Sequence, residues 1–154
     1  MTYHYIDSGL DNVVLDDGYH ITETPYGEGV SIEKVDALHD LIGRTIIDQG
    51  HGLNGAELRF LRIEMDLTQA GLALLVGTEE QTLRRWEKAR SKPIPGPADR
   101  ILRALYQEFI GEARAVRPMV ERLARSEGQP VHARLHFKRT RQGWSLQKAA
   151  LVDA

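Results

Sequence analysis

The sequence predicts an α+β fold that is mainly α-helical, with a helical bundle between a small N-terminal β-meander plus helix and a C-terminal β-hairpin. Three observations predict it: short alternating segments with glycine turns in the first thirty residues, apolar residues at helical spacing through the middle of the chain, and a further alternating segment near the end. We therefore expect an acidic domain at 1–50, a helical region at 55–127 and a hairpin at 130–150.

The expected meander rests on alternation and turn signals. Tyr3 and Tyr5, then Val13 and Leu15, alternate with polar residues, which is typical of short strands. The intervening turn signals are Ser8-Gly9, Asp17-Gly18 and Gly27-Glu28-Gly29.

An amphipathic helix is expected next, over residues 32–48, with Ser31 as its N-cap. Its apolar residues recur every three or four positions: Ile32, Val35, Leu38, Leu41, Ile42 and Ile46. The segment 49–55 is rich in glycine, which is typical of a linker or loop.

Three short helices are expected between residues 58 and 90. The first, 58–67, presents Leu58, Leu61 and Met65 on one face. Thr68 should cap the second, 69–76, whose contributions to the core are Leu72, Leu75 and Val76, with the small Ala73 where a neighbouring helix passes closely. Gly77 should end it, and Thr78 should cap a third helix with Leu83 and Trp86 on its inner face.

The remaining chain reads as two helices and a hairpin. No helix can cross the proline-rich segment 93–97. The helix beyond it should carry the apolar stripe Ile101, Leu102, Leu105, Tyr106 and Phe109, which is more than one short helix needs for its own packing, so we expect a homodimer held by this region. A further helix should begin near Pro118, and 131–146 should form a two-stranded hairpin around 141–143.

Composition and charge limit the classes of function. The 154 residues include no cysteine, so neither disulfides nor thiolate zinc sites are available, and we expect no metal or cofactor. No apolar run is long enough to span a membrane and the start resembles no export signal, so we expect a cytoplasmic protein without membrane contact. The net charge of −2 is distributed unevenly: residues 1–54 carry a net charge of −8, and residues 55–154 carry +6. Phosphate binding therefore belongs to the second part.

The pattern Thr68-Gln69-x-x-Leu72-Ala73-x-x-x-Gly77, followed by Leu83, Trp86 and Glu87, resembles the helix-turn-helix of the Cro/CI (Xre-type) repressors, which implies a lambda-repressor-like bundle that binds DNA. Further matches at 57–62 and 81–88 resemble the MqsA/HigA-type antitoxin repressors. Those antitoxins usually hold zinc through cysteines, which this chain lacks, so neither the metal nor the identity of a toxin carries over. The same short pattern also occurs in helical hairpins that do not bind DNA.

The resemblance makes the third helix the recognition helix, with its N-terminal residues toward the bases. Arg85 is suited to guanine and Gln81 to adenine, Thr82 and Arg84 flank them, and Gln69 matches a glutamine that binds phosphate. The candidate DNA-binding residues are Gln69, Thr78, Gln81, Thr82, Arg84, Arg85, Lys88, Arg90 and Lys92. The resemblance also implies a structural ion pair between Arg62 and Glu87.

Other clusters carry weaker signals. His132 and His136 have a spacing that suits metal ligands on a helix, but in a strand both would lie on the polar face. Asp16-Asp17 and the pair Asp36 and Asp40 are expected to be solvated acids. No nucleophile, phosphate loop or nucleotide fingerprint is recognisable, so we expect no enzyme.

Three functions are compatible with these observations. The leading expectation is an autoregulating antitoxin that binds a palindromic operator in double-stranded DNA as a dimer, while its acidic N-terminal part neutralises a toxin of the ribonuclease type. The alternative is a stand-alone repressor from a phage, plasmid or accessory element, or else an interaction module whose helix-turn-helix no longer binds DNA.

Overall fold

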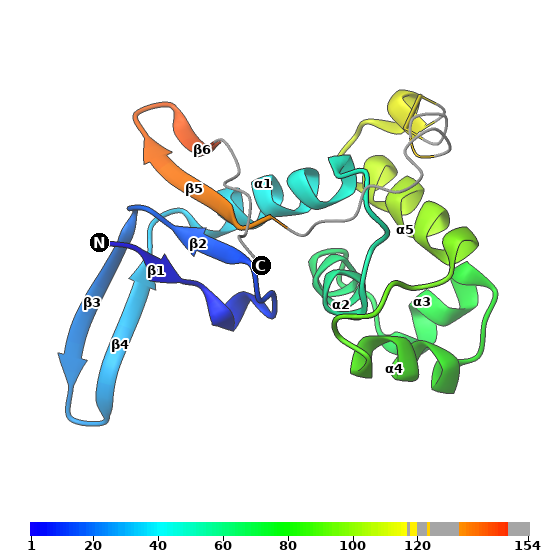
Figure 1. Ribbon diagram of the computed structural model, residues 1–154, viewed down its shortest axis with the longest axis horizontal. Helices are drawn as coiled ribbons and strands as arrows, with labels where there is room; N and C mark the ends of the chain where they lie inside the picture. Colours follow the sequence, from blue (N-terminus) through cyan, green and yellow to red (C-terminus); the bar gives the residue numbers. More distant parts are fainter. Residues whose placement is uncertain (117, 120–122, 124–132, 148–154) are drawn as a thin grey trace. The chain divides into compact units, whose positions relative to one another are not determined.

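The computed structural model describes residues 1–116, 118–119, 123 and 133–147, which fall into two compact units (Figure 1). Unit 1 comprises Met1–Ile42 and Val131–Ala154, and unit 2 comprises Gly43–Pro130. The described residues form five α-helices and two small sheets, which confirms a fold of mixed helices and strands. None of these helices is long and apolar enough to cross a membrane.

Unit 1 contains a four-stranded sheet with the order β1-β2-β5-β6, formed by Tyr3–His4, Val13–Leu15, Leu135–Thr140 and Gly143–Leu146. The central pair, β2 and β5, is parallel and sets Val13 beside Leu135 and Leu15 beside Phe137. These four side chains are buried. In β5 the buried residues alternate with more exposed ones, whereas all three residues of β2, including Val14, are buried.

The C-terminal hairpin forms as predicted, with β5 and β6 antiparallel. It is not a separate part of the chain, however, because β5 pairs with β2 about 120 residues away and the ladder continues from Asp16 N–H to the carbonyl of Phe137 at 3.0 Å. A two-stranded hairpin has too little partner surface to bury its apolar face alone. Joining the N-terminal sheet gives Leu135 and Phe137 that partner surface.

The N-terminal strands do not form one meander. Strands β3 (Tyr19–Thr24) and β4 (Gly27–Ile32) make a separate two-stranded sheet that extends away from the four-stranded one in Figure 1. Gly27 starts β4 instead of lying in a turn, because Thr24 closes the hairpin earlier. The hydroxyl of Thr24 donates to the carbonyl of Gly27 at 2.6 Å and accepts from the N–H of Tyr26 at 3.2 Å.

The first α-helix, α1 (Val35–Asp48), begins three residues later than expected. Ser31 is not its N-cap, because this residue pairs with His20 in the β3–β4 ladder, and Ile32 still pairs with Tyr19. Lys34, at a φ of 45°, makes the change from strand to helix. Strand pairing therefore takes precedence over the local capping signal.

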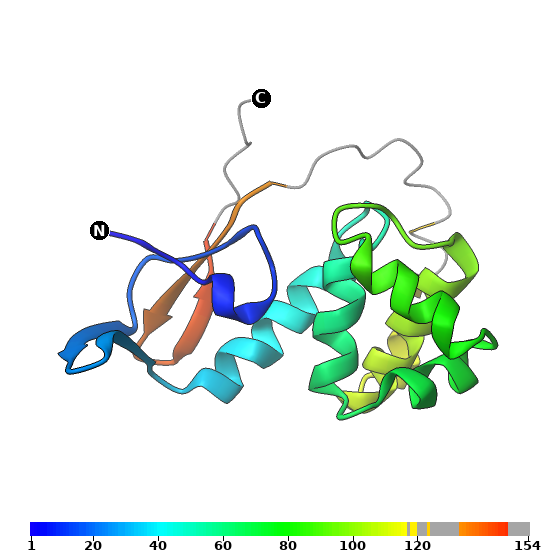
Figure 2. The ribbon, with the colours of Figure 1, turned by 90° about the horizontal axis from the view of Figure 1, so that it is seen from below.

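Unit 2 packs four further helices, α2 (Gly55–Glu64), α3 (Gln69–Val76), α4 (Glu80–Lys88) and α5 (Gly96–Phe109), with the short 3-10 turn Ala113–Ala115 (Figure 2). Helix α2 starts three residues earlier than expected because Asn54 and Glu57 form a capping box. The side chain of Asn54 accepts from the N–H of Glu57 at 2.8 Å, and Glu57 accepts from the N–H of Asn54 at 2.9 Å. The core of this unit includes the fully buried side chains of Leu53, Leu58, Leu61, Leu72, Leu83, Leu102 and Tyr106.

The expected linker at 49–55 is held by one buried arginine. Arg103 is 0% exposed and donates to Asp99 Oδ1 at 2.7 Å. It also donates to Asp99 Oδ2 at 3.4 Å and to three backbone carbonyls, those of Ile47 at 2.9 Å, Gln49 at 2.6 Å and His51 at 2.6 Å. The division between the units therefore falls near residue 42 and not near 50, since the end of α1 is bonded to α5.

The apolar stripe of α5 is used largely inside unit 2. Leu102 and Tyr106 are fully buried, so they cannot hold a second copy of the chain as the sequence led us to expect. Phe109, at 54%, and Ile101, at 38%, remain exposed. The helix expected from Pro118 falls mostly on residues outside those described.

Glu57 makes the stability of unit 2 depend on pH. Burial raises the pKa of its carboxyl from 4.5 to about 7, although the N–H of Asn54 and the cation of Arg103 oppose the shift and Asp99 adds to it. The folded state thus holds a proton that the unfolded state releases, and this contribution to stability is lost as the pH rises from about 4.5 through about 7.

We expect Glu57→Gln, which keeps an oxygen for Asn54 but carries no charge, to equal the wild type near pH 4 and to be more stable by about 1 to 3 kcal/mol near pH 8. Urea unfolding of both proteins across this range measures the difference. Burial lowers the pKa of His51, which has the opposite effect on stability, but His51 is present in both proteins and cancels. Parallel pH profiles would contradict the assignment.

Candidate nucleic-acid interface

Helices α3 and α4 are joined by a short turn whose local chemistry follows the sequence. The hydroxyl of Thr68 caps α3 by accepting from the N–H of Gly71 at 2.9 Å. Gly77 ends α3 at a φ of 83°, and its N–H donates to the carbonyl of Ala73 at 2.9 Å. These predictions are confirmed, including the bounds of α3. Figure 1 shows α3 and α4 next to each other in unit 2.

The start of α4 differs from the prediction. Thr78 is not the N-cap, because its N–H still bonds the carbonyl of Ala73 at 2.9 Å and the helix begins one residue later. Glu79 occupies the cap position without a side-chain hydrogen bond to the backbone. Thr78 is half-buried in the turn, just before the N-terminus of α4.

The inner faces of the two helices agree with the prediction only in part. Leu72 and Leu83 are fully buried, whereas Trp86 is half-buried. Leu75 is 51% exposed and therefore lies outside the core, contrary to expectation. The inward face of α3 is centred between Leu72 and Ala73. At about 100° per residue, Leu75 lies about 110° around the helix from that centre, which places it at the side of the helix.

An ion pair anchors α4 to α2. Arg62 donates to both carboxylate oxygens of Glu87, from Nε at 2.7 Å and from Nη2 at 3.0 Å, and its Nη1 donates to the carbonyl of Leu67 at 2.9 Å. Both side chains are mostly buried, with 13% and 6% exposed. The pair implied by the resemblance is thus confirmed, and it fixes one face of α4.

Gln69 extends this ion pair toward the surface. Its amide nitrogen donates to Glu87 at 3.1 Å, and its carbonyl oxygen accepts from Nε of Arg84 at 3.1 Å. Nη2 of Arg84 also donates to Glu80 at 2.6 Å. Gln69 therefore positions Arg84 and keeps one amide hydrogen for an outside acceptor.

The outward face of α4 is polar and open. Gln81, Arg84, Arg85 and Lys88 are exposed and Thr82 is half-buried. Arg85 donates to the hydroxyl of Thr82 at 3.3 Å, one turn earlier. Gln81 and Arg85 are one helical turn apart, so their side chains can reach one ligand surface together.

The basic residues after α4 lie on a segment bonded to the start of α2. Arg90 and Lys92 are exposed, and their carbonyls accept from the N–H groups of Ala56 at 3.1 Å and Gly55 at 3.2 Å. Ile94 N–H donates to the carbonyl of Leu53 at 2.8 Å. The free donors at the start of α2 are thereby satisfied and the basic segment is held in place.

A close contact that the sequence did not reveal fixes α4 against α2. A Cβ on Gly55 would lie 2.0 Å from the backbone oxygen of Trp86 and 2.8 Å from that of Ala89. Only glycine allows the end of α4 to approach α2 this closely.

Two acids of the other candidate clusters, Asp16 and Asp17, are bonded to residues of β5. His132 lies outside the described residues, and His136 Nδ1 bonds Asp16 Oδ1 at 2.8 Å. Asp17 accepts from the N–H of Arg139 at 2.5 Å, so this acid supports β5. Within the described part of the chain, no three histidine or acidic side chains are grouped as metal ligands would be.

Comparison with known proteins identifies no relative. No protein-family model, no curated protein and no solved structure matches this chain.

Proposed function

We propose that the chain is a sequence-specific repressor of transcription that binds double-stranded DNA with α3 and α4 as a helix-turn-helix of the lambda-repressor type. One observation carries the proposal: α4 is fixed on one side by Leu83 and by the ion pair of Glu87, while its opposite side exposes Gln81 and Arg85. A rigid helix with exposed amide and guanidinium groups fits readout in the major groove.

The surrounding residues would hold the DNA backbone. Arg84, oriented by Gln69, and the basic residues Lys88, Arg90 and Lys92 border the proposed reading face. Thr78, at the turn before α4, would add a contact near the helix N-terminus. Such contacts set orientation and affinity, whereas base contacts set sequence preference.

The repressor would act as a homodimer on a palindromic operator, because one recognition helix covers only a few base pairs. Paired half-sites in such operators lie about 34 to 36 Å apart. With Leu102 and Tyr106 buried in the protomer, the dimer would have to use other residues, such as the exposed Phe109.

Arg85→Ala and Gln81→Ala are each expected to weaken operator binding by about 1 to 3 kcal/mol and to leave binding to random DNA nearly unchanged. Lys92→Ala should weaken both and lower the slope of log affinity against log salt by about one unit. Salt titrations on the DNA upstream of its own reading frame and on a random duplex of the same length measure these effects. If Arg85→Ala lowers both affinities and the slope together, Arg85 binds phosphate and does not read bases.

A protein-binding role as an antitoxin is the second candidate, and the β3–β4 hairpin favours it. Ile21 and Val30 pair across the strands and are 46% and 38% exposed, and Glu23 lies directly opposite Glu28. An apolar pair beside like charges would suit a basic partner such as a ribonuclease toxin. The four basic residues of 133–147 reduce the acidic character of unit 1, so the partner surface would be this hairpin and not the whole unit. Adding the product of the adjacent reading frame to the titrations above distinguishes an antitoxin from a stand-alone repressor.

A further inference from the structure

The β5–β6 hairpin carries a concentration of positive charge in the otherwise acidic unit 1. Residues 133–147 include four basic residues and no acid. Arg139 lies 3.7 Å from Glu33 and is mostly buried, so its charge is compensated inside the unit. Arg134, Lys138 and Arg141 are exposed and make no ion pair with any described residue. Three cations on this hairpin are therefore available to an outside anion.

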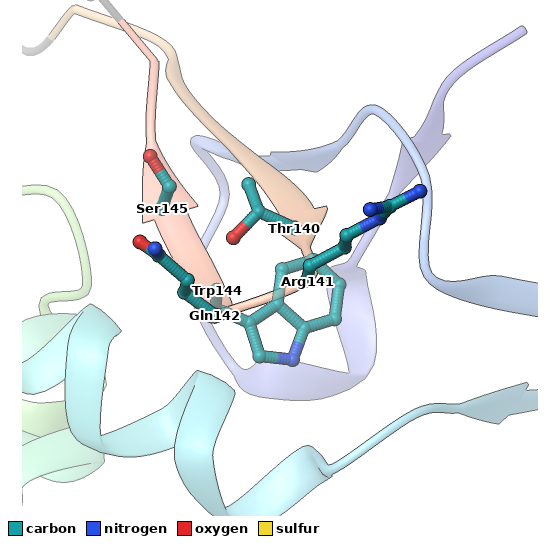
Figure 3. Close-up of a pocket in the computed structure, with 5 residues that line it drawn as sticks. All are labelled: Thr140, Arg141, Gln142, Trp144 and Ser145. Atoms are coloured by element: carbon teal, nitrogen blue, oxygen red, sulfur yellow. The ribbon is translucent and has the colours of Figure 1, made fainter.

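The tip of the hairpin is hollowed and lined with hydrogen-bond donors. A pocket of about 500 Å³ is bordered by Thr140, Arg141, Gln142, Trp144 and Ser145 (Figure 3). Figure 3 shows Arg141 and Gln142 extending from the turn to opposite sides, and Ser145 on β6. The guanidinium of Arg141, the amide of Gln142 and the hydroxyl of Ser145 are groups that bind phosphate oxygens in nucleic-acid complexes.

The tip is also held by contacts within unit 1. Trp144 donates from its indole nitrogen to the carbonyl of Glu33 at 3.0 Å, and its ring covers Gly18, where a Cβ would lie 2.5 Å from the ring. Thr140 donates to the carbonyl of Gly143 at 2.7 Å across the turn. A hairpin fixed in this way would lose little conformational freedom on binding, which favours affinity.

We propose that the β5–β6 hairpin is a second DNA-binding element, which contacts backbone phosphates of the duplex through Arg134, Lys138 and Arg141. This proposal rests on the proposed function, which makes double-stranded DNA the ligand of the chain. The contact concerns phosphate alone, so it would increase affinity for any sequence and contribute nothing to base preference.

The test uses the full chain and the double variant Lys138→Gln/Arg141→Gln. On a random 30-base-pair duplex, we expect affinity at about 0.1 M salt to fall by at least about tenfold and the salt slope to fall by about two units, since each lost phosphate contact removes about 0.9. Lys34→Gln is the matched control, because it removes an exposed cation of unit 1 outside the hairpin and should change neither quantity. Thermal unfolding confirms that all proteins are folded.

The outcomes separate this proposal from the proposed function. A wild type that binds DNA, with a double variant of equal affinity and slope, would overturn the hairpin contact and leave the role of α4 intact. A wild type that binds neither the random duplex nor its own upstream DNA would overturn both. Free phosphate is the other ligand with the same chemistry, and a titration with inorganic phosphate at constant ionic strength tests it. Suppose that the wild type binds phosphate saturably, that the double variant does not, and that both bind DNA equally. The hairpin would then be a site for free phosphate, and its role on DNA would be overturned.

Discussion

Replacement of Arg103 by methionine is expected to lower the free energy of unfolding by about 3 to 5 kcal/mol, because it leaves the buried carboxylate of Asp99 without its counter-charge. The substitution also removes the donors to the carbonyls of Ile47, Gln49 and His51, which lie at the end of α1 and in the loop after it. Urea unfolding followed by tryptophan fluorescence measures the loss.

A control and a double variant distinguish the ion pair from a general effect on α5. Arg100→Met changes an exposed arginine on the same helix and should shift stability by less than about 0.5 kcal/mol. Asp99→Leu/Arg103→Met should cost less than the sum of the two single changes, since no uncompensated charge remains. Additive losses would show that the two residues do not stabilise unit 2 as a pair.

The second large effect is expected from Gly55→Ala. The added methyl group would lie 2.0 Å from the backbone oxygen of Trp86, and a backbone atom cannot move aside as the end of a side chain can. Helices α2 and α4 must therefore separate, which should cost about 3 kcal/mol or more. If α4 reads DNA, its displacement should also reduce operator affinity, even in the fraction that remains folded.

Gly52→Ala is the matched control for this variant. Gly52 also lies in unit 2 and has no positive φ, and a Cβ there would meet nothing closer than the Cβ of Pro93 at 3.6 Å, an ordinary van der Waals distance, so the change should shift stability by less than about 0.5 kcal/mol. Unfolding midpoints of the two variants in urea give the comparison. Equal stability of Gly55→Ala and the wild type would mean that α4 does not approach α2 as closely as the structure places it.

Features that depend on neighbouring residues could be predicted from the sequence. The bounds of α3 follow from Thr68 as a cap and Gly77 as a left-handed terminator, both of which act within one turn of the backbone. The β5–β6 hairpin follows from alternation on either side of a glycine turn. The ion pair of Arg62 and Glu87 was predicted from the resemblance and not from local signals, because its partners are in different helices.

Features that depend on distant partners required the tertiary structure. A strand alternates apolar and polar residues whichever strand it pairs with, so the sequence could not indicate that β5 joins β2 in parallel. Arg103 reads as one more polar residue of an amphipathic helix, because its buried position is set by carbonyls that lie 52 to 56 residues away. The exposure of Leu75 depends in the same way on which face of α3 meets its neighbours.

The sequence by itself thus determined the order of the elements, the caps of α3 and the residues of the candidate reading face, because backbone preference and helical spacing act over a few residues. Only the tertiary structure decided that Gln69 positions Arg84, that Gly55 is needed for contact with α4, and that the basic hairpin belongs to the N-terminal sheet. These three features depend on which surfaces of the chain meet. The chain as a whole decides this, because folding must bury apolar area and pair buried charges in all elements at the same time.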